Sequence, residues 1–276
     1  MVAAADGVSH PRVGQRVFGT ALSGGLAELA LVEAEDVYVL PERMDPSIAA
    51  GFELNYGTSF HGLVDLASLR EGETLLVLGA AGGVGLSAVA IGRALGARVV
   101  ACASAPERRD ACEAAGAELV LDSSCGAAGL RDALASADLR GNVDVVFDVV
   151  GGELSEVAMR ALGWGGRFLV VGFASGGATP KAAIPSVPLN LALLNERRVL
   201  GVFWGAWKSR DAEGRAANRA NVQEMLRMIS EGKLKPPPSR VYPFEKFRDA
   251  FDDMAKRRAI GKLVVSGPAA APAARL

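Results

Sequence analysis

The sequence has few of the residues that build metal centres and disulfide frameworks. It holds three cysteines and two histidines, no C-x-x-C pair, and no cysteine before Cys102. This usage argues against a disulfide scaffold, a structural zinc site and a catalytic zinc held by cysteine and histidine. We therefore expect no bound metal and a reducing, cytoplasmic compartment.

Long apolar runs and a large net charge are also missing. No apolar stretch approaches the roughly 20 residues that a membrane span needs, and Met1 to Asp6 lacks the basic and apolar segments of a signal peptide. The formal net charge is −1, so nothing favours a polyanionic partner. We expect a soluble protein that binds neither membrane nor nucleic acid.

The chain changes its hydrophobic pattern near residue 45. Before it, short apolar runs at 15–20, 26–32 and 37–40 alternate with turn residues, which is typical of strands and hairpins. Over 46–69 the apolar residues take a helical period. We expect a partial β-rich domain from 1–45 and 240–266, a dinucleotide-binding domain over 46–239, and a disordered Ala/Pro-rich tail over 267–276.

Strand and helix patterns alternate from residue 74 onward. The predicted strands are 74–78, 98–103, 119–121, 143–147, 167–171 and 198–204, with a further short strand at 262–265. The predicted helices are 84–95, 106–115, one near Leu130, one near Met159, 218–231 and 245–256. Repeated strand–helix–strand units predict an α/β fold, a Rossmann-type doubly wound parallel sheet with helices on both faces.

A glycine-rich turn follows the first of these strands. Residues 79–85 read Gly-Ala-Ala-Gly-Gly-Val-Gly and lead into the helix at 84–95. Small residues let the backbone approach a pyrophosphate, and the amino terminus of the next helix offers free N–H groups. A glycine cluster alone is often only a turn, but its position between a strand and a helix favours a dinucleotide site.

The end of the second strand indicates which dinucleotide binds. NAD sites usually place a carboxylate there, whereas this strand ends at the neutral Ser104 and is followed by Arg108 and Arg109. Guanidinium groups suit a 2′-phosphate, so this stretch favours NADPH. The alternative is that both arginines belong to a solvated first helical turn, and the neighbouring Glu107 keeps that alternative open.

Several segments resemble the zinc-free medium-chain reductases of the quinone oxidoreductase (zeta-crystallin-like) family. Residues 77–85 resemble the family's phosphate loop, and residues 165–176 resemble its nicotinamide-side strand and loop. Further similar segments lie at 13–17, 55–61, 199–205 and 261–265. The resemblance extends from about residue 13 to 266. It implies a Rossmann domain joined to a partial GroES-like substrate domain, and a homodimer.

The same resemblance implies NADPH-dependent, zinc-independent reduction of a small-molecule quinone or α,β-unsaturated carbonyl. It assigns the pyrophosphate, the 2′-phosphate and the nicotinamide to separate groups of residues. The implied cofactor contacts are Thr58, Ala81, Gly82, Gly83, Val84, Gly85, Ser104, Arg108, Gly172, Phe173, Ala174, Phe203, Trp204 and Arg257. Among them, Ser104 and Arg108 are assigned to the 2′-phosphate.

Two departures from the family pattern leave alternatives open. Ser123 stands where many members have a tyrosine, and the family's opening strands have no counterpart before Val13. The chain therefore either starts late or has an incomplete cleft, and an enoyl-thioester reductase and a non-catalytic NADPH-binding protein remain alternatives.

Two residues are candidate proton donors in the helix that the resemblance places beside the cleft. These are Tyr56 and His61. A packing role is the alternative for both, because buried aromatic rings are more often core than catalytic. Asp144 and Asp148 flank a predicted strand, and we interpret them as strand-end and turn residues.

Overall fold

The computed structural model describes residues 1, 3–21, 23–176 and 184–267. The chain divides into two compact units, one formed by Met1–Leu54 with Pro238–Leu276 and the other by Asn55–Pro237. Residues 268–276, which make up most of the predicted tail, lie outside the described residues.

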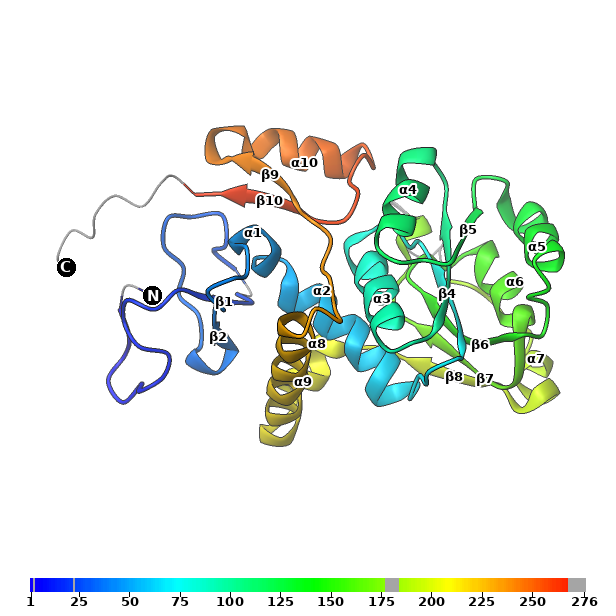
Figure 1. The fold of residues 1–276 in the computed structure, drawn as a ribbon, viewed down its shortest axis with the longest axis horizontal. Helices are drawn as coiled ribbons and strands as arrows, with labels where there is room; N and C mark the ends of the chain where they lie inside the picture. The colour runs from blue at the N-terminus through cyan, green and yellow to red at the C-terminus, as the bar shows by residue number, and fades with distance from the viewer. Residues whose placement is uncertain (2, 22, 177–183, 268–276) are drawn as a thin grey trace. The chain divides into compact units, whose positions relative to one another are not determined.

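A six-stranded, all-parallel sheet forms the centre of the larger unit, in the order β5-β4-β3-β6-β7-β8 (Figure 1). Its strands are β3 Thr74–Leu78, β4 Arg98–Ala103, β5 Leu119–Asp122, β6 Val143–Asp148, β7 Leu162–Val170 and β8 Arg198–Gly201. The predicted α/β fold with a doubly wound sheet is confirmed. Every residue of β3 is buried, as expected for a central strand that is covered on both faces.

The helices of this sheet lie in two layers because the chain reverses direction across β3. Helix α3 Gly83–Ala94 connects β3 to β4, and α4 Pro106–Ala114 connects β4 to β5. Helix α5 Gly126–Ser136 then returns the chain to β6, on the other side of β3, and α6 Glu153–Ala161 connects β6 to β7. Right-handed crossovers place these two helix pairs on opposite faces. The reversal leaves a crevice at the carboxyl ends of β3 and β6, where α/β proteins bind their ligands.

The larger unit contains further helices outside these crossovers. Helix α2 Phe52–Phe60 starts in the smaller unit and continues into a π-helical turn at His61–Leu66. The others are α7 Asn190–Leu193, α8 Trp204–Ser209, α9 Ala212–Ser230, and 3-10 turns at Ala174–Gly176 and Leu194–Glu196.

The smaller unit contains two short sheets. Strands β1 Val17–Gly19 and β2 Val37–Val39 pair antiparallel, while β9 Arg240–Pro243 and β10 Leu263–Ser266 pair parallel. Its helices are α1 Pro46–Ala49, α10 Phe247–Ala255 and 3-10 turns at Ala34–Asp36 and Phe244–Lys246. The rings of Phe18, Tyr38 and Phe52 pack together in this unit.

Two strand predictions are corrected by the structure. Residues 26–32 form no strand, and Leu29 and Leu31 are 64% and 97% exposed. A short apolar run meets only half of the condition for a strand, which also needs a neighbouring strand to take up its backbone hydrogen bonds. The strand predicted at 198–204 ends at Gly201, because Trp204 begins α8.

Candidate cofactor site

The glycine turn lies at the carboxyl end of β3, beside the loop that follows β6. Gly79 has a φ of +67°, and a Cβ on it would lie 2.7 Å from the γ carbons of Val149 and Val150. A Cβ on Gly85 would overlap the carbonyl oxygen of Gly79. Glycine is therefore required at both positions, at the first for a left-handed turn and at the second for close packing of α3 on β3.

The same turn leaves an open cradle at the amino terminus of α3. A Cβ on Gly82, the N-cap residue, would meet only the Gly79 carbonyl oxygen, at 3.6 Å. In the described part of the chain no side chain caps this helix. A Cβ on the next residue, Gly83, would lie 2.8 Å from Asn55 Nδ2. The first turn of this twelve-residue helix thus has no capping side chain among the described residues, an arrangement that fits the pyrophosphate of a dinucleotide.

Asp148 fixes the opposite wall of the crevice. Its carboxylate accepts hydrogen bonds from the backbone N–H groups of Val150 (2.8 Å) and Gly151 (2.9 Å) and from the Ser155 hydroxyl (2.6 Å). These contacts hold the turn after β6 and the first residues of α6, which is a structural role.

The loop after β7 lies against this turn. The backbone N–H groups of Gly172 and Ala174 donate to the carbonyl oxygens of Asp148 (3.3 Å) and Val149 (3.0 Å). Phe173, between them, is 39% exposed. The structure thus brings Gly172, Phe173 and Ala174 to the same edge of the sheet as the glycine turn.

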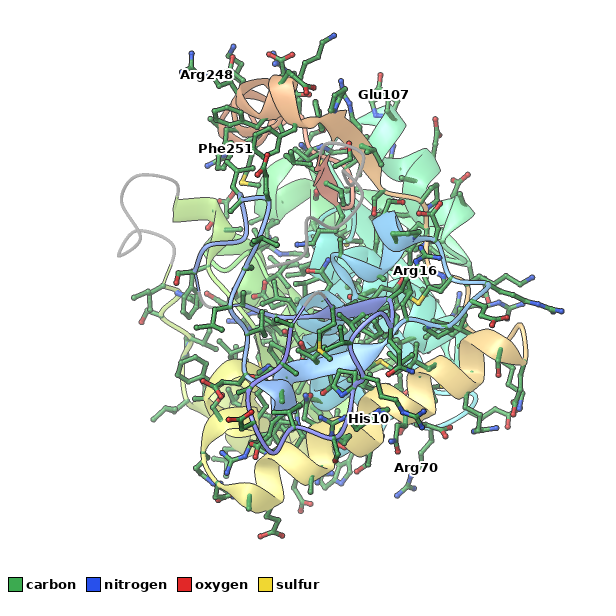
Figure 2. All side chains as sticks on the ribbon, turned by 90° about the vertical axis from the view of Figure 1, so that its left-hand side faces the viewer. His10, Arg16, Arg70, Glu107, Arg248 and Phe251 are labelled. Carbon is green, nitrogen blue, oxygen red and sulfur yellow. The ribbon has the colours of Figure 1, made fainter. Side chains whose placement is uncertain are left out.

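The carboxyl end of β4 carries the residues assigned to the 2′-phosphate. Ser104 is exposed directly after the strand, and Arg108 is half-buried in the first turn of α4. The Arg109 guanidinium lies 3.0 Å from the Asp122 carboxylate, whereas Glu107 is exposed and points away from the fold (Figure 2). The carboxylate of Asp122 thus compensates part of the charge of Arg109.

Hydrogen bonds of two buried serines connect α2 to the amino-terminal part of α3. The Ser59 and Ser87 hydroxyls lie 2.8 Å apart, and Ser87 Oγ is also 2.8 Å from the Val84 carbonyl oxygen and 3.0 Å from that of Asn55. This network fixes the helix that carries Thr58 beside the glycine turn. The sequence analysis did not assign a role to Asn55, Ser59 or Ser87, because hydrophobic periodicity does not identify which two helices pack against each other.

The two candidate proton donors are both buried in α2 and the turn that follows it. Tyr56 is 6% exposed, and burial raises the pKa of its hydroxyl well above the ordinary value. His61 is 4% exposed, stacks on Trp207, and pairs through Nδ1 with Asp65 at 2.8 Å. A catalytic role remains a prediction for both residues, and the contacts of His61 also suit the packing alternative.

The remaining predicted contacts differ in their surroundings. Trp204 is 4% exposed and its indole N–H donates to Asn218 at 2.8 Å, whereas Phe203 is 77% exposed. Arg257 lies in the smaller unit, directly after α10. The assignment of all three to the cofactor stays a prediction.

Potential metal ligands do not cluster in the part of the chain that the structure describes. There, no three or more His, Cys, Asp or Glu side chains are placed to hold a metal ion. Within the same residues, no helix is both long and apolar enough to cross a bilayer.

Comparison with known proteins places this architecture in a family. The family model described as "Zinc-binding dehydrogenase" matches residues 115–265. Quinone oxidoreductase-like protein 2 of Bos taurus is 32% identical over 260 residues, which cover 94% of this chain and 71% of that protein.

Solved structures give the same result. The CurK enoyl reductase is 27% identical with a TM-score of 0.79, covering 95% of this chain and 74% of that one. The Thermus thermophilus quinone oxidoreductase, whose structures include a complex with NADPH, is 30% identical with a TM-score of 0.76, covering 91% of this chain and 77% of that one. The chain belongs to the medium-chain dehydrogenase/reductase family of oxidoreductases, in its quinone oxidoreductase group.

Proposed function

We propose that the chain uses NADPH to reduce quinones or α,β-unsaturated carbonyl compounds without zinc. The observation that carries this proposal is the open cradle of Gly82 at the amino terminus of α3, beside the neutral end of β4. The similarity to quinone oxidoreductase-like protein 2 and to the quinone oxidoreductase of Thermus thermophilus supports it.

In this proposal each edge of the crevice binds one part of the cofactor. The backbone amides from Ala81 to Gly85 hold the pyrophosphate, and Ser104 and Arg108 hold the 2′-phosphate. Thr58, the loop at 172–174 and the exposed ring of Phe203 border the nicotinamide. When bound, NADPH supplies a hydride to carbon, while the protein orients the two reactants and keeps water out.

The acceptor oxygen gains negative charge as carbon takes the hydride, so a proton donor nearby assists the reaction. Tyr56 and His61 are the two candidate donors; burial raises the pKa of Tyr56 Oη, so this hydroxyl stays protonated at neutral pH but is a weaker acid than an exposed tyrosine. Nδ1 of His61 pairs with Asp65, so that this nitrogen is not available to hydrogen-bond a substrate.

The experiment is a steady-state assay of NADPH oxidation by the purified full chain against a panel of quinones and enones. We expect turnover with at least one acceptor and a lower KM for NADPH than for NADH. Tight NADPH binding without turnover on any acceptor would instead support the non-catalytic alternative.

Reduction of an enoyl thioester is the second candidate. The observation that favours it is the similarity to the CurK enoyl reductase over 95% of this chain. Adding an enoyl thioester to the panel separates the candidates, because the true substrate class will have the larger kcat/KM.

A further inference from the structure

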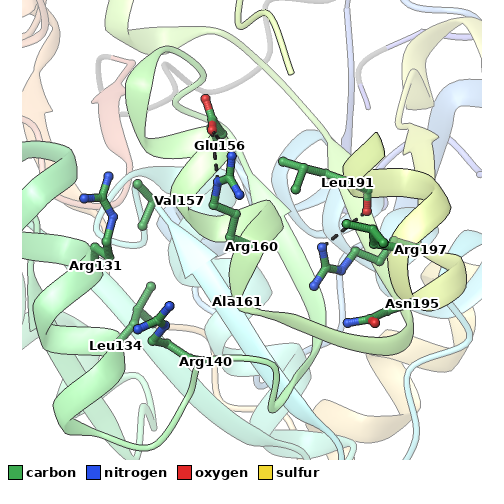
Figure 3. A pocket seen from close by; sticks show the side chains of 11 residues that line it. Arg131, Leu134, Arg140, Glu156, Val157, Arg160, Ala161, Leu191, Asn195 and Arg197 are labelled. Atoms are coloured by element: carbon green, nitrogen blue, oxygen red, sulfur yellow. Dashed lines mark hydrogen bonds and ion pairs between the residues drawn. The ribbon is translucent and has the colours of Figure 1, made fainter. Parts of the chain in front are cut away.

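A second pocket, with a volume of about 610 Å³, lies in the larger unit away from the glycine turn (Figure 3). Its walls come from α5, α6, the segment at 191–197 and the loop before β6. Arg140 and Arg197 enter it from just before β6 and β8, at the amino-terminal ends of these parallel strands. The glycine turn is at the carboxyl ends, roughly 20 Å away for a six-residue strand such as β6.

The wall of this pocket is strongly basic and its floor is apolar. Within the described part of the chain, the lining holds four arginines and a single carboxylate, that of Glu156. The arginines are Arg131, Arg140, Arg160 and Arg197. The floor is formed by core side chains that are at most 6% exposed, namely Leu134, Val157, Ala161 and Leu191.

Two of the arginines, Arg160 and Arg197, are held in place by protein contacts. Arg160 donates from Nε (3.0 Å) and Nη2 (2.7 Å) to the Glu156 carboxylate, which compensates its charge. Arg197 donates from Nε (3.1 Å) and Nη2 (2.7 Å) to the Leu162 carbonyl and from Nη1 (3.2 Å) to that of Leu191. Carbonyl oxygens orient this guanidinium but do not neutralise it. Burial, and then the positive charge of Arg160, lower the pKa of Arg197, so like charges are crowded at this place.

The other two arginines have unused donors. Among the described residues, Arg131 and Arg140 make no hydrogen bond or ion pair, and Figure 3 draws contacts only for Arg160 and Arg197. Arg131 by itself could simply be an exposed side chain on the solvated surface of α5. A solvated surface does not account for three guanidinium groups around one hollow that have no carboxylate partner in the described part of the chain, those of Arg131, Arg140 and Arg197, an arrangement that a bound anion would stabilise.

We propose that this pocket binds a small organic molecule that carries phosphoryl groups, at a site separate from the cofactor crevice. The forked donors of arginine match phosphate oxygens, and the apolar floor suits a carbon body attached to the phosphate. The volume falls within the range of about 300–1,000 Å³ that is usual for small-molecule sites. The site is independent of the proposed reductase activity.

The test is calorimetric titration of inorganic pyrophosphate into the full chain at constant ionic strength. The variant is Arg131→Ala/Arg140→Ala, which removes two exposed side chains with no protein partner among the described residues. We expect it to bind pyrophosphate at least roughly tenfold more weakly than the wild type, because charge-assisted hydrogen bonds are lost.

The matched control is Arg93→Ala, which removes an exposed arginine from α3 on the opposite face of the sheet and should bind as the wild type does. The proposal is wrong if the wild type does not bind pyrophosphate. It is also wrong if the double variant binds pyrophosphate as tightly as the wild type does, because the anion would then bind at the glycine turn. Phenyl phosphate should bind more tightly than inorganic phosphate, because its ring reaches the apolar floor. Equal affinities for these two probes would overturn the organic part of the proposal.

Discussion

At the scale of single residues, two arginines, Arg108 and Arg109, follow the neutral end of β4. Their position after a neutral strand end predicts the preference for a 2′-phosphate, but the sequence does not distinguish the two. The structure pairs Arg109 with Asp122, whose pKa is lowered by the hydrogen bond with Ser124 and then by Arg109. This partner comes from β5, so only the folded sheet brings it to α4.

We predict that Arg108→Ala weakens NADPH binding by roughly ten- to a hundred-fold, because it removes a charge-assisted hydrogen bond to the 2′-phosphate. NADH lacks that phosphate and should bind almost unchanged. Calorimetric titration of both cofactors measures the effect. Arg109→Ala is the neighbouring control and should lose less, since Asp122 already compensates its charge.

The assignment of the 2′-phosphate is wrong if the wild type prefers NADH. It is also wrong if the double variant Arg108→Ala/Arg109→Ala loses both cofactors equally. In either case the arginines are an ordinary solvated helix start.

At the scale of helices and strands, the sequence predicts what is local and misses what depends on contacts between elements. Strands β3 and β4 have the predicted bounds because each is a buried apolar run that ends at turn residues. The run at 26–32 is also mainly apolar but forms no strand, since a strand needs a neighbour for its backbone hydrogen bonds. The contact of α2 with α3 rests on Ser59 and Ser87, which hydropathy alone does not single out.

We predict that Ser87→Ala lowers the free energy of unfolding by about 0.5–1.5 kcal/mol, because the hydrogen bonds of the Ser87 hydroxyl are lost while Ser59 keeps its bond to the Val84 carbonyl oxygen at 2.9 Å. Urea unfolding should show a lower midpoint with an unchanged slope. Ser136→Ala, at an exposed position that ends α5, is the control and should change stability by less than about 0.5 kcal/mol. A Ser87→Ala variant as stable as the wild type would show that these hydrogen bonds do not stabilise the contact of α2 with α3.

At the scale of the whole molecule, the family description and the described residues differ on metal. The matching family model is described as zinc-binding, yet the described residues contain no group of ligands for a metal ion.

We therefore predict that chelators leave the melting temperature and the activity unchanged, since metal removal destabilises only a protein that holds a metal. Differential scanning calorimetry with and without a chelator measures the first effect, and the NADPH oxidation assay measures the second. Stoichiometric zinc in elemental analysis of the purified chain would contradict this prediction.

One edge of the large sheet, strand β8, carries exposed apolar side chains. Strand β8 is its terminal strand, none of its four residues is buried, and Val199 is 56% exposed. Leu189 and Leu193, which precede it in the chain, are 86% and 79% exposed. An apolar edge strand left open invites pairing with another chain, and two-fold pairing satisfies both copies at once.

We expect the wild type to form a dimer at micromolar concentration, with twice the chain mass in light scattering. Val199→Lys should shift it toward monomer, because a charged side chain on an edge strand opposes pairing. Val241→Lys is the matched control, since Val241 is 47% exposed on β9 of the smaller unit and its substitution should leave the dimer intact. A monodisperse wild-type monomer, or equal dissociation of both variants, would show that β8 is not the dimer interface.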